Sequence, residues 1–180
     1  MTTQTLCRPI GGDEIMQRID ELCDVLDDCV SGGASVSFML PFARETAAAF
    51  WQGVAQSVAR HERVVLIAVN GQQRIVGTVQ IILDQPENQP HRADVAKLLV
   101  HQSARRQGIA RLLMDKLDDI ARENGKSVLV LDTATGSDAE LFYRKCGWIR
   151  AGEIPRYALM PNGNVTGTTI FYKFLELASI

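Results

Sequence analysis

The residues of this chain that most clearly could do chemistry lie in a basic stretch that includes a loop. Residues 96–111 contain no acidic side chain. Their charged residues are all basic, namely Lys97, Arg105, Arg106 and Arg111. A helix beginning at Gly108 would offer unpaired backbone N–H groups and the positive end of its dipole to an anion. Small residues at Gly108 and Ala110 would let a ligand approach the backbone. The loop over residues 103–110 therefore predicts a phosphate-binding site.

Two common phosphate-binding motifs do not account for this loop. The Gly-Lys-Ser at residues 125–127 has Ile120 where a P-loop needs its first glycine, and it precedes a strand instead of following one. No Gly-x-Gly-x-x-Gly occurs, which argues against a dinucleotide-binding fold. The alternative is an ordinary basic connection. Its position between a predicted strand and a predicted amphipathic helix favours the anion site.

The segments around the loop predict a strand–helix–strand unit. Residues 93–100 and 128–131 are apolar runs typical of strands, the second of a strand buried on both faces. Residues 108–123 place leucine and isoleucine on one helical stripe. Such a unit makes the two strands parallel, with a right-handed crossover. Ligands of open α/β sheets lie beyond the carboxyl ends of parallel strands, where Val100 and Asp132 are expected.

The rest of the chain completes one predicted α/β domain over residues 1–180. Helices are predicted at residues 13–30 and 44–60, and a capping box of Ser137 and Glu140 opens a short helix that Gly147 closes. Asn70-Gly71 indicates a hairpin between two of the strands. The remaining strands are predicted at residues 5–10, 64–69, 75–83, 148–154 and 168–175.

Composition and charge exclude several classes of protein. The chain has 180 residues and a net charge of −2, and a pI near 5.9 argues against a nucleic-acid partner. No apolar run is long enough for a membrane span or a signal peptide, so no membrane partner is expected. The cysteines are scattered without metal-ligand spacing, which predicts no metal and no disulfides: Cys7, Cys23, Cys29 and Cys146. We therefore expect a cytoplasmic protein.

The basic loop resembles a known signature. Residues 105–110, Arg-Arg-Gln-Gly-Ile-Ala, are similar to the Arg/Gln-x-x-Gly-x-Gly/Ala pyrophosphate motif of the GNAT superfamily of acetyl-CoA-dependent N-acetyltransferases. Residues 98–100 and 140–148 also resemble that family, and many relatives have glycine where this chain has Ala110. The resemblance covers nearly the whole chain. It implies a mixed, mostly antiparallel sheet whose central parallel strands splay apart at the coenzyme site.

The resemblance also implies how acetyl-CoA, the cosubstrate, is held. Pantetheine would pair with the backbone of the strand before the loop, at Leu98 and Val100. A backbone N–H near Leu99 or Val100 would polarise the thioester carbonyl. The implied coenzyme-binding residues are Leu98, Leu99, Val100, Arg105, Arg106, Gln107, Gly108, Ile109, Ala110, Arg111 and Tyr143.

Acetyl transfer to an amine needs a group that removes the ammonium proton. Asp94 and Asp132 are the candidates, acting directly or through a water, although a carboxylate is a weak base unless its pKa is raised. Either could instead be an ordinary strand-edge or turn residue. The resemblance assigns Tyr143 as the acid that protonates the departing thiolate, although the helical stripe alone suggests a core residue. Direct transfer is preferred to a covalent intermediate on Cys146.

The acceptor implied by the resemblance is a small-molecule amine, such as an amino-acid-like toxin or antibiotic. Residues 36–42 and 152–163 could roof a closed pocket, which favours a small acceptor. The alternatives are a protein or peptide N-acetyltransferase and a non-catalytic acetyl-CoA-binding module. Both a monomer and a homodimer are compatible with the sequence, because a strand at residues 170–175 could pair within the chain or across a dimer.

Overall fold

One seven-stranded sheet organises residues 5–177, which are the residues that the computed structural model describes. The strand order is β1-β2-β3-β4-β5-β7-β6. The strands are β1 (Leu6–Ile10), β2 (Arg63–Val69), β3 (Ile75–Ile82), β4 (Arg92–Val100), β5 (Val128–Ala134), β6 (Ile149–Leu159) and β7 (Val165–Phe174). The helices are α1 (Gly12–Gln17), α2 (Ile19–Ser31), α3 (Arg44–Ala59), α4 (Ile109–Glu123) and α5 (Asp138–Lys145), with a 3-10 turn at Gln102–Ala104.

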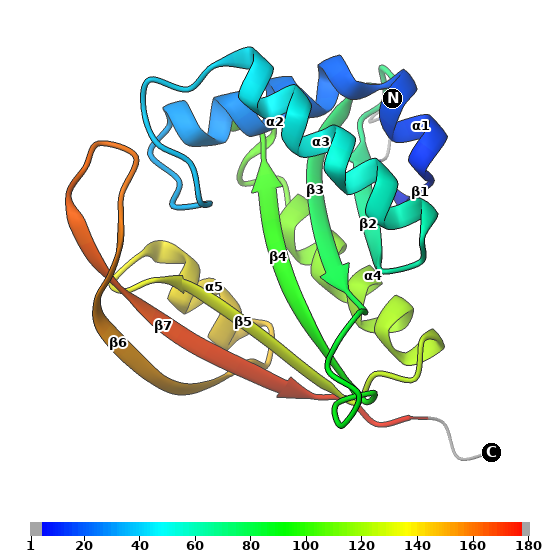
Figure 1. Cartoon of the computed structure of the whole chain (residues 1–180), viewed down its shortest axis with the longest axis vertical. Helices are drawn as coiled ribbons and strands as arrows, with labels where there is room; N and C mark the ends of the chain where they lie inside the picture. The colour runs from blue at the N-terminus through cyan, green and yellow to red at the C-terminus, as the bar shows by residue number, and fades with distance from the viewer. Residues whose placement is uncertain (1–4, 178–180) are drawn as a thin grey trace.

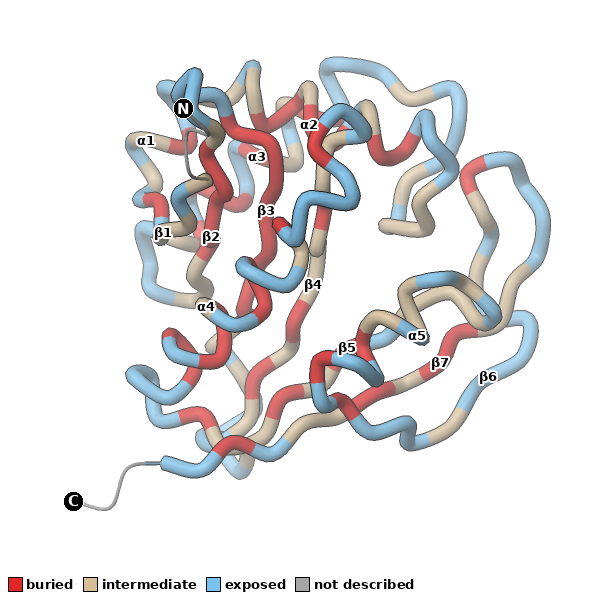
Figure 2. The backbone as a smooth tube through the Cα atoms, turned by 180° about the vertical axis from the view of Figure 1, so that it is seen from behind, coloured by how far each residue is buried: buried red, intermediate tan, exposed pale blue. Residues whose placement is uncertain are grey.

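Helices cover both faces of the sheet (Figure 1). Helices α1–α3 lie on one face and α4 on the other. In β2, Val65 and Ile67 pack into the core beneath α1–α3, whereas Leu66 and Ala68 pack into the core beneath α4. Successive strand residues point to opposite faces, so β2 is buried on both sides. Figure 2 shows this burial along β2 and β3, in contrast to the exposed β6.

The sheet opens between β4 and β5. Neighbouring strands are antiparallel except β4 and β5, which are parallel as predicted. Within residues 5–177, only three residue pairs join them: Arg92 with Val128, Ala93 with Leu129 and Asp94 with Val130. Beyond these pairs the strands diverge, and Figure 1 shows the opening. The predicted splayed, mostly antiparallel sheet is confirmed.

The segment predicted as one helix over residues 13–30 is two helices that meet at Arg18. Its backbone angles, φ −110° and ψ 21°, end α1 and let α2 begin in a new direction. The Arg18 guanidinium donates to Glu21 at 2.9 Å and to the Gln73 carbonyl at 2.6 Å, which ties the bend to the β2–β3 turn. Both helices face the same core, so the apolar spacing continues through the bend and does not reveal it.

The prediction that β5 is buried on both faces is wrong. Leu129 and Leu131 are buried, but Val128 and Val130 are only partly buried. The two leucines belong to the core beneath α4, and β5 contributes no residue to the core beneath α1–α3. The reason is that β5 lies where the sheet opens, so helices cover only one of its faces.

The predicted capping box of α5 is absent. Ser137 forms no side-chain cap with any described residue. Instead, Glu140 Oε1 accepts hydrogen bonds from the Gly136 N–H at 3.2 Å and from the Thr169 hydroxyl of β7. Glu140 therefore fixes α5 to the sheet. Gly147, with φ 84°, follows the end of the helix as predicted.

The last two strands are longer than predicted and form an extended hairpin. β7 pairs with β5 on one side and with β6 on the other. The pairing partners of residues 170–175 thus lie within this chain. β6 is exposed along most of its length at the edge of the sheet.

The cysteines do not form disulfides. Cys23, Cys29 and Cys146 are buried free thiols, and Cys7 is a partly buried one. Within residues 5–177, no group of three or more His, Cys, Asp or Glu side chains is arranged to hold a metal ion. In the same part of the chain, none of the helices has the length and apolarity that a bilayer-spanning segment requires.

Candidate active site

The loop between β4 and α4 leaves several backbone N–H groups free. Arg106 has φ 60° and Gly108, which precedes α4, has φ 76°, so the chain passes twice through the left-handed region. The N–H groups of residues 106–108 have no hydrogen-bond partner among the described residues. Within the described chain, the first turn of α4 holds no acidic residue and no side-chain cap. These donors and the helix dipole fit a phosphate group.

The loop side chains partly stabilise the loop itself. Arg105 Nε donates to the Val100 carbonyl at 3.2 Å, and Gln107 Nε2 donates to the Ser103 carbonyl at 3.3 Å. Arg105, Arg106 and Gln107 are all exposed. Because the two arginines already lie at the surface, their guanidinium groups can reach an anion at the loop.

The start of α4 faces both the core and α5. Ile109 is buried, so only its backbone can reach a ligand, and Ala110 is partly buried. Arg111 pairs with Asp115 at 2.8 Å and donates to the Lys145 carbonyl of α5 at 3.2 Å. The Arg111 guanidinium is therefore already bound by groups of the protein itself.

The carboxyl-terminal half of β4 presents an open backbone edge to β5. Leu98 lines the cleft between the two strands, whereas Leu99 is only 2% exposed and packs into the core. Val100 pairs with Gly77 of β3, on the side away from β5. An extended ligand chain could pair with this edge as a strand would.

A cleft of about 370 Å³ lies where β4 and β5 diverge. Its walls come from residues 33–37, 95–98, 132–134, 157–160 and 166–168, with Ser137, Ala139 and Tyr143 from the start of α5 and from α5 itself. The Leu40 N–H donates to the Pro161 carbonyl at 3.0 Å. This bond joins the loop between α2 and α3 to the β6–β7 turn, so two walls of the cleft are tied together.

The two predicted aspartates lie in different surroundings. Asp132 lines the cleft, and its Oδ2 accepts a hydrogen bond from the Thr168 hydroxyl at 2.7 Å. Asp94 lies at the last position of β4 that pairs with β5, where Arg92 and Gln85 bind its carboxylate. Both carboxylates line an adjoining cavity of about 340 Å³. Asp132 therefore reaches both spaces, whereas Asp94 reaches the adjoining cavity alone.

Tyr143 lies on α5 and is both a core residue and a cleft residue. Its side chain is 8% exposed and packs against Trp148 and Phe171 at ring-centroid distances of 6.1 and 6.0 Å. It also lines the cleft that contains Asp132. Burial raises the pKa of the Tyr143 phenol, so the hydroxyl stays protonated at neutral pH.

Lys97 lies in the cleft, whereas the sequence singled it out only as part of the acid-free stretch that predicts the phosphate site. It lies where β4 shifts its register against β3, between the positions that pair with Thr78 and Gln80, and it has φ 55°. The Thr78 hydroxyl donates to the Lys97 carbonyl at 3.2 Å and stabilises this irregular backbone. The acid-free stretch of residues 96–111 was the sequence signal for Lys97, but the register shift that carries it to the cleft cannot be predicted from spacing.

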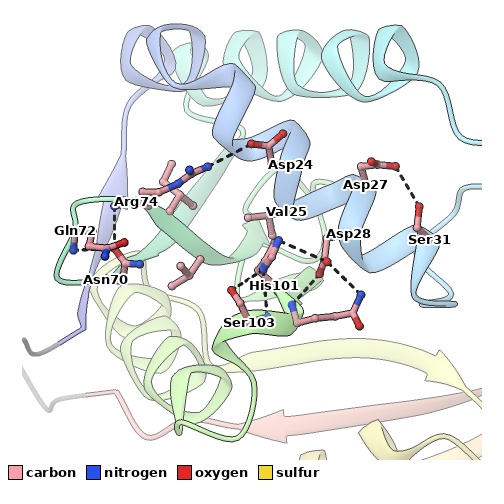
Figure 3. Close-up of a pocket in the computed structure, with 13 residues that line it drawn as sticks. Asp24, Val25, Asp27, Asp28, Ser31, Asn70, Gln72, Arg74, His101 and Ser103 are labelled. Carbon is pink, nitrogen blue, oxygen red and sulfur yellow. Dashed lines mark hydrogen bonds and ion pairs between the residues drawn. The ribbon is translucent and has the colours of Figure 1, made fainter. Parts of the chain in front are cut away.

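A larger cavity of about 610 Å³ lies between α2 and the β2–β3 turn (Figure 3). Asp24, Asp27 and Asp28 line it, which opposes binding of an anion such as the coenzyme. Asp28 Oδ2 accepts the Gln102 N–H at 2.8 Å, and His101 Nε2 lies 3.5 Å from Asp28 Oδ1. Asp28 thus anchors the turn that leads into the basic loop.

The chain matches known acetyltransferases in sequence. Residues 22–148 match the model of the acetyltransferase (GNAT) family. An uncharacterized N-acetyltransferase from the hisH-hisA intergenic region of Azospirillum brasilense is 32% identical over 131 residues, which cover 67% of this chain and 75% of that relative.

Solved structures share the fold at lower identity. A provisionally assigned acetyltransferase from Acinetobacter baylyi superposes with a TM-score of 0.81 at 18% identity, covering 98% of this chain and 96% of its own. The yncA protein of Salmonella typhimurium, solved with its cofactor acetyl-CoA, gives 0.77 at 14% identity, covering 99% and 98%.

These solved structures share the fold of this chain. The chain belongs to the GNAT family of acetyltransferases, and it is an acyltransferase.

Proposed function

We propose that this protein transfers the acetyl group of acetyl-CoA directly to the amine of a small molecule. The main support is the cleft at the diverging ends of β4 and β5, because Asp132 and Tyr143 both line it beside the open edge of β4. A carboxylate and a phenol supply the proton acceptor and the proton donor that amine acetylation requires.

The basic loop is the proposed site for the pyrophosphate of acetyl-CoA. The free N–H groups of residues 106–108 and the exposed guanidinium groups of Arg105 and Arg106 suit its charge. When bound, the coenzyme supplies an acetyl thioester. The backbone of Leu98 and Val100 would hold the pantetheine chain, and an N–H near Leu99 or Val100 would polarise the thioester carbonyl. Such a donor contributes about 3 kcal/mol to transition-state stabilisation.

Asp132 is the proposed proton acceptor, acting directly or through a water. Its hydrogen bond from Thr168 fixes the carboxylate at the cleft and leaves its other oxygen available. Asp94 is a weaker candidate because Arg92 and Gln85 already bind it. We assign Asp94 a structural role at the point where the pairing of β4 with β5 ends.

Tyr143 is the proposed proton donor to the departing thiolate. Its raised pKa keeps the phenol protonated until that step. A covalent intermediate on Cys146 is disfavoured, because this thiol is buried in the core and burial raises its pKa. A thiol with a raised pKa provides little thiolate for nucleophilic attack.

A small acceptor fits the cleft better than a protein segment does. The hydrogen bond between Leu40 and Pro161 ties two of its walls together, and a folded protein surface would have to separate them. Residues 32–39, 131–133 and 152–155 also resemble segments of the tabtoxin resistance protein, and the first two overlap the cleft walls. This resemblance supports an amino-acid-like toxin or antibiotic as the acceptor.

Location and assembly follow from the same proposal. Four free thiols suit the reducing cytoplasm. Both a monomer and a homodimer remain compatible with the proposed chemistry.

The proposal is tested by following thiol release from acetyl-CoA with a panel of amino acids, other small amines and peptides. We expect at least one small amine to be acetylated with a higher kcat/KM than every peptide. Faster turnover of peptides would support a protein or peptide N-acetyltransferase instead. Tight acetyl-CoA binding without turnover of any amine would support a non-catalytic coenzyme-binding module.

A further inference from the structure

The cleft contains a cation that the proposed proton transfers do not use. Lys97 lines the cleft together with Asp132, and the register shift of β4 places it there with a left-handed φ of 55°. A non-glycine residue in this region carries a cost of about 1 kcal/mol. The backbone thus maintains an unfavourable conformation at the position that presents a lysine to the cleft.

The Lys97 ammonium has two aromatic rings and a hydroxyl as neighbours. Nζ lies 6.0 Å from the ring centroid of Phe38 and 5.7 Å from that of Phe50, distances at which a cation and a ring attract. It donates to the Ser37 hydroxyl at 3.3 Å. These groups orient the ammonium but supply no negative charge.

A negative partner for Lys97 is missing from the described part of the chain. Among residues 5–177, no carboxylate forms an ion pair with its ammonium. Asp132 is near enough to favour the charged form, but burial is the larger effect and lowers the pKa of Lys97. A partly buried ammonium without a counterion gains stability from an anion that enters the cleft.

We propose that Lys97 binds a carboxylate of the acceptor, so that the preferred acceptors carry both an amine and a carboxylate. The inference rests on the proposed function. Asp132 attracts the ammonium of such a molecule, and Lys97, with the Ser37 hydroxyl, attracts its carboxylate. The two side chains line one cleft, so their opposite charges select the orientation of a zwitterionic acceptor. Lys97 is a specificity-determining residue and takes no part in the proton transfers.

The test compares each of the twenty common L-amino acids with its α-carboxamide. The carboxamide keeps the amine and the side chain but removes the negative charge. It also lowers the pKa of the amine, so more of the carboxamide carries the neutral, reactive amine at neutral pH, which works against a preference for the acid. The variants are Lys97→Met, which removes the charge, Lys97→Arg, which keeps it, and Lys116→Met as the matched control on α4, outside the cleft. The readouts are thiol release and calorimetric titration of the amino acid in the presence of coenzyme A.

We expect the wild-type protein and Lys116→Met to prefer the acid over its carboxamide in kcat/KM. Lys97→Met should raise KM for the acid by about tenfold to a hundredfold, as expected for loss of a charged hydrogen bond, and leave KM for the carboxamide and kcat nearly unchanged. Lys97→Arg should keep the preference. A purely structural lysine would instead lower the melting temperature and affect the acid and the carboxamide equally, which would overturn the inference.

The titration separates failure of this inference from failure of the proposed function. If wild-type protein acetylates no amine but an amino acid binds and Lys97→Met weakens that binding alone, the proposed function fails, and the result supports Lys97 as a carboxylate-binding residue only. If amines are acetylated without any preference for the acid, the inference fails and the proposed function stands. Absence of any amino acid binding would overturn the inference as well.

Discussion

Asp132 and Tyr143 face the same cleft with very different exposure to solvent. Asp132 is exposed and accepts one hydrogen bond from Thr168. Tyr143 is buried among aromatic rings, which raises the pKa of its phenol. A carboxylate accepts protons and a phenol donates them, so the two side chains can serve opposite ends of one transfer.

At the residue scale, Tyr143→Phe tests the proposed acid. The substitution removes one hydroxyl and keeps the ring contacts with Trp148 and Phe171. We expect kcat to fall by about a hundredfold, a typical contribution of a general acid, while the Kd of acetyl-CoA changes by less than about twofold. Stopped-flow thiol assays and calorimetry measure the two quantities.

Tyr172→Phe is the matched control for this prediction. Tyr172 lies on β7, and its ring packs against Phe174. Loss of its hydroxyl should leave kcat unchanged. An unchanged kcat in Tyr143→Phe, with the control behaving as expected, would remove Tyr143 from the acid role.

At the scale of elements, the role of the basic loop can be tested at α4, because a glycine in the left-handed region lies at each end of this helix. Gly108 precedes the helix with φ 76°, and Gly125 follows it with φ 69°. An added Cβ meets no atom within 4 Å at either position, so both substitutions to alanine act through backbone strain of about 1 kcal/mol. Only Gly108 adjoins the free N–H groups of the basic loop.

We therefore expect Gly108→Ala and Gly125→Ala to lower the free energy of unfolding to a similar extent. Gly108→Ala alone should raise the Kd of acetyl-CoA, by about tenfold, because its Cβ and the altered turn disturb hydrogen bonds to a charged group. Urea denaturation and calorimetry measure the two effects. Equal coenzyme affinity in both variants would argue that the pyrophosphate lies elsewhere.

The elements differ in how well the sequence predicts them. The unit of β4, α4 and β5 was predictable because hydrophobic periodicity and a glycine boundary are local signals. The break at Arg18 was not, since it depends on Gln73, a partner 55 residues away. The capping box failed for a similar reason: Thr169 of β7 competes successfully for the Glu140 carboxylate.

The site shows the same division between local and distant signals. The basic loop was predicted at the correct boundary because its charge and its glycine are contiguous in sequence. Lys97 reaches the cleft through a register shift between β3 and β4, and Thr168 reaches Asp132 through the pairing of β5 with β7. Such long-range pairings leave no pattern in either strand alone.

At the scale of the whole molecule, acidic and basic side chains gather at different places. The net charge is only −2. Three aspartates line the cavity beside α2, whereas the loop before α4 carries exposed arginines. The bond between Leu40 and Pro161 closes the α2–α3 loop onto the β6–β7 turn. The proposal builds on this arrangement, with the coenzyme's phosphates at the loop and a small acceptor in the cleft.

Direct transfer at this cleft is tested best by following the acetyl group itself. Mass spectrometry of a quenched single turnover, with acetyl-CoA and an acceptor found by the amine panel, locates the acetyl group on the amine or on the protein. We predict acetylated amine from the first time point, with no acetylated protein formed ahead of it. Acetyl-protein that appears first on Cys146 and decays as the acetylated amine forms would contradict direct transfer.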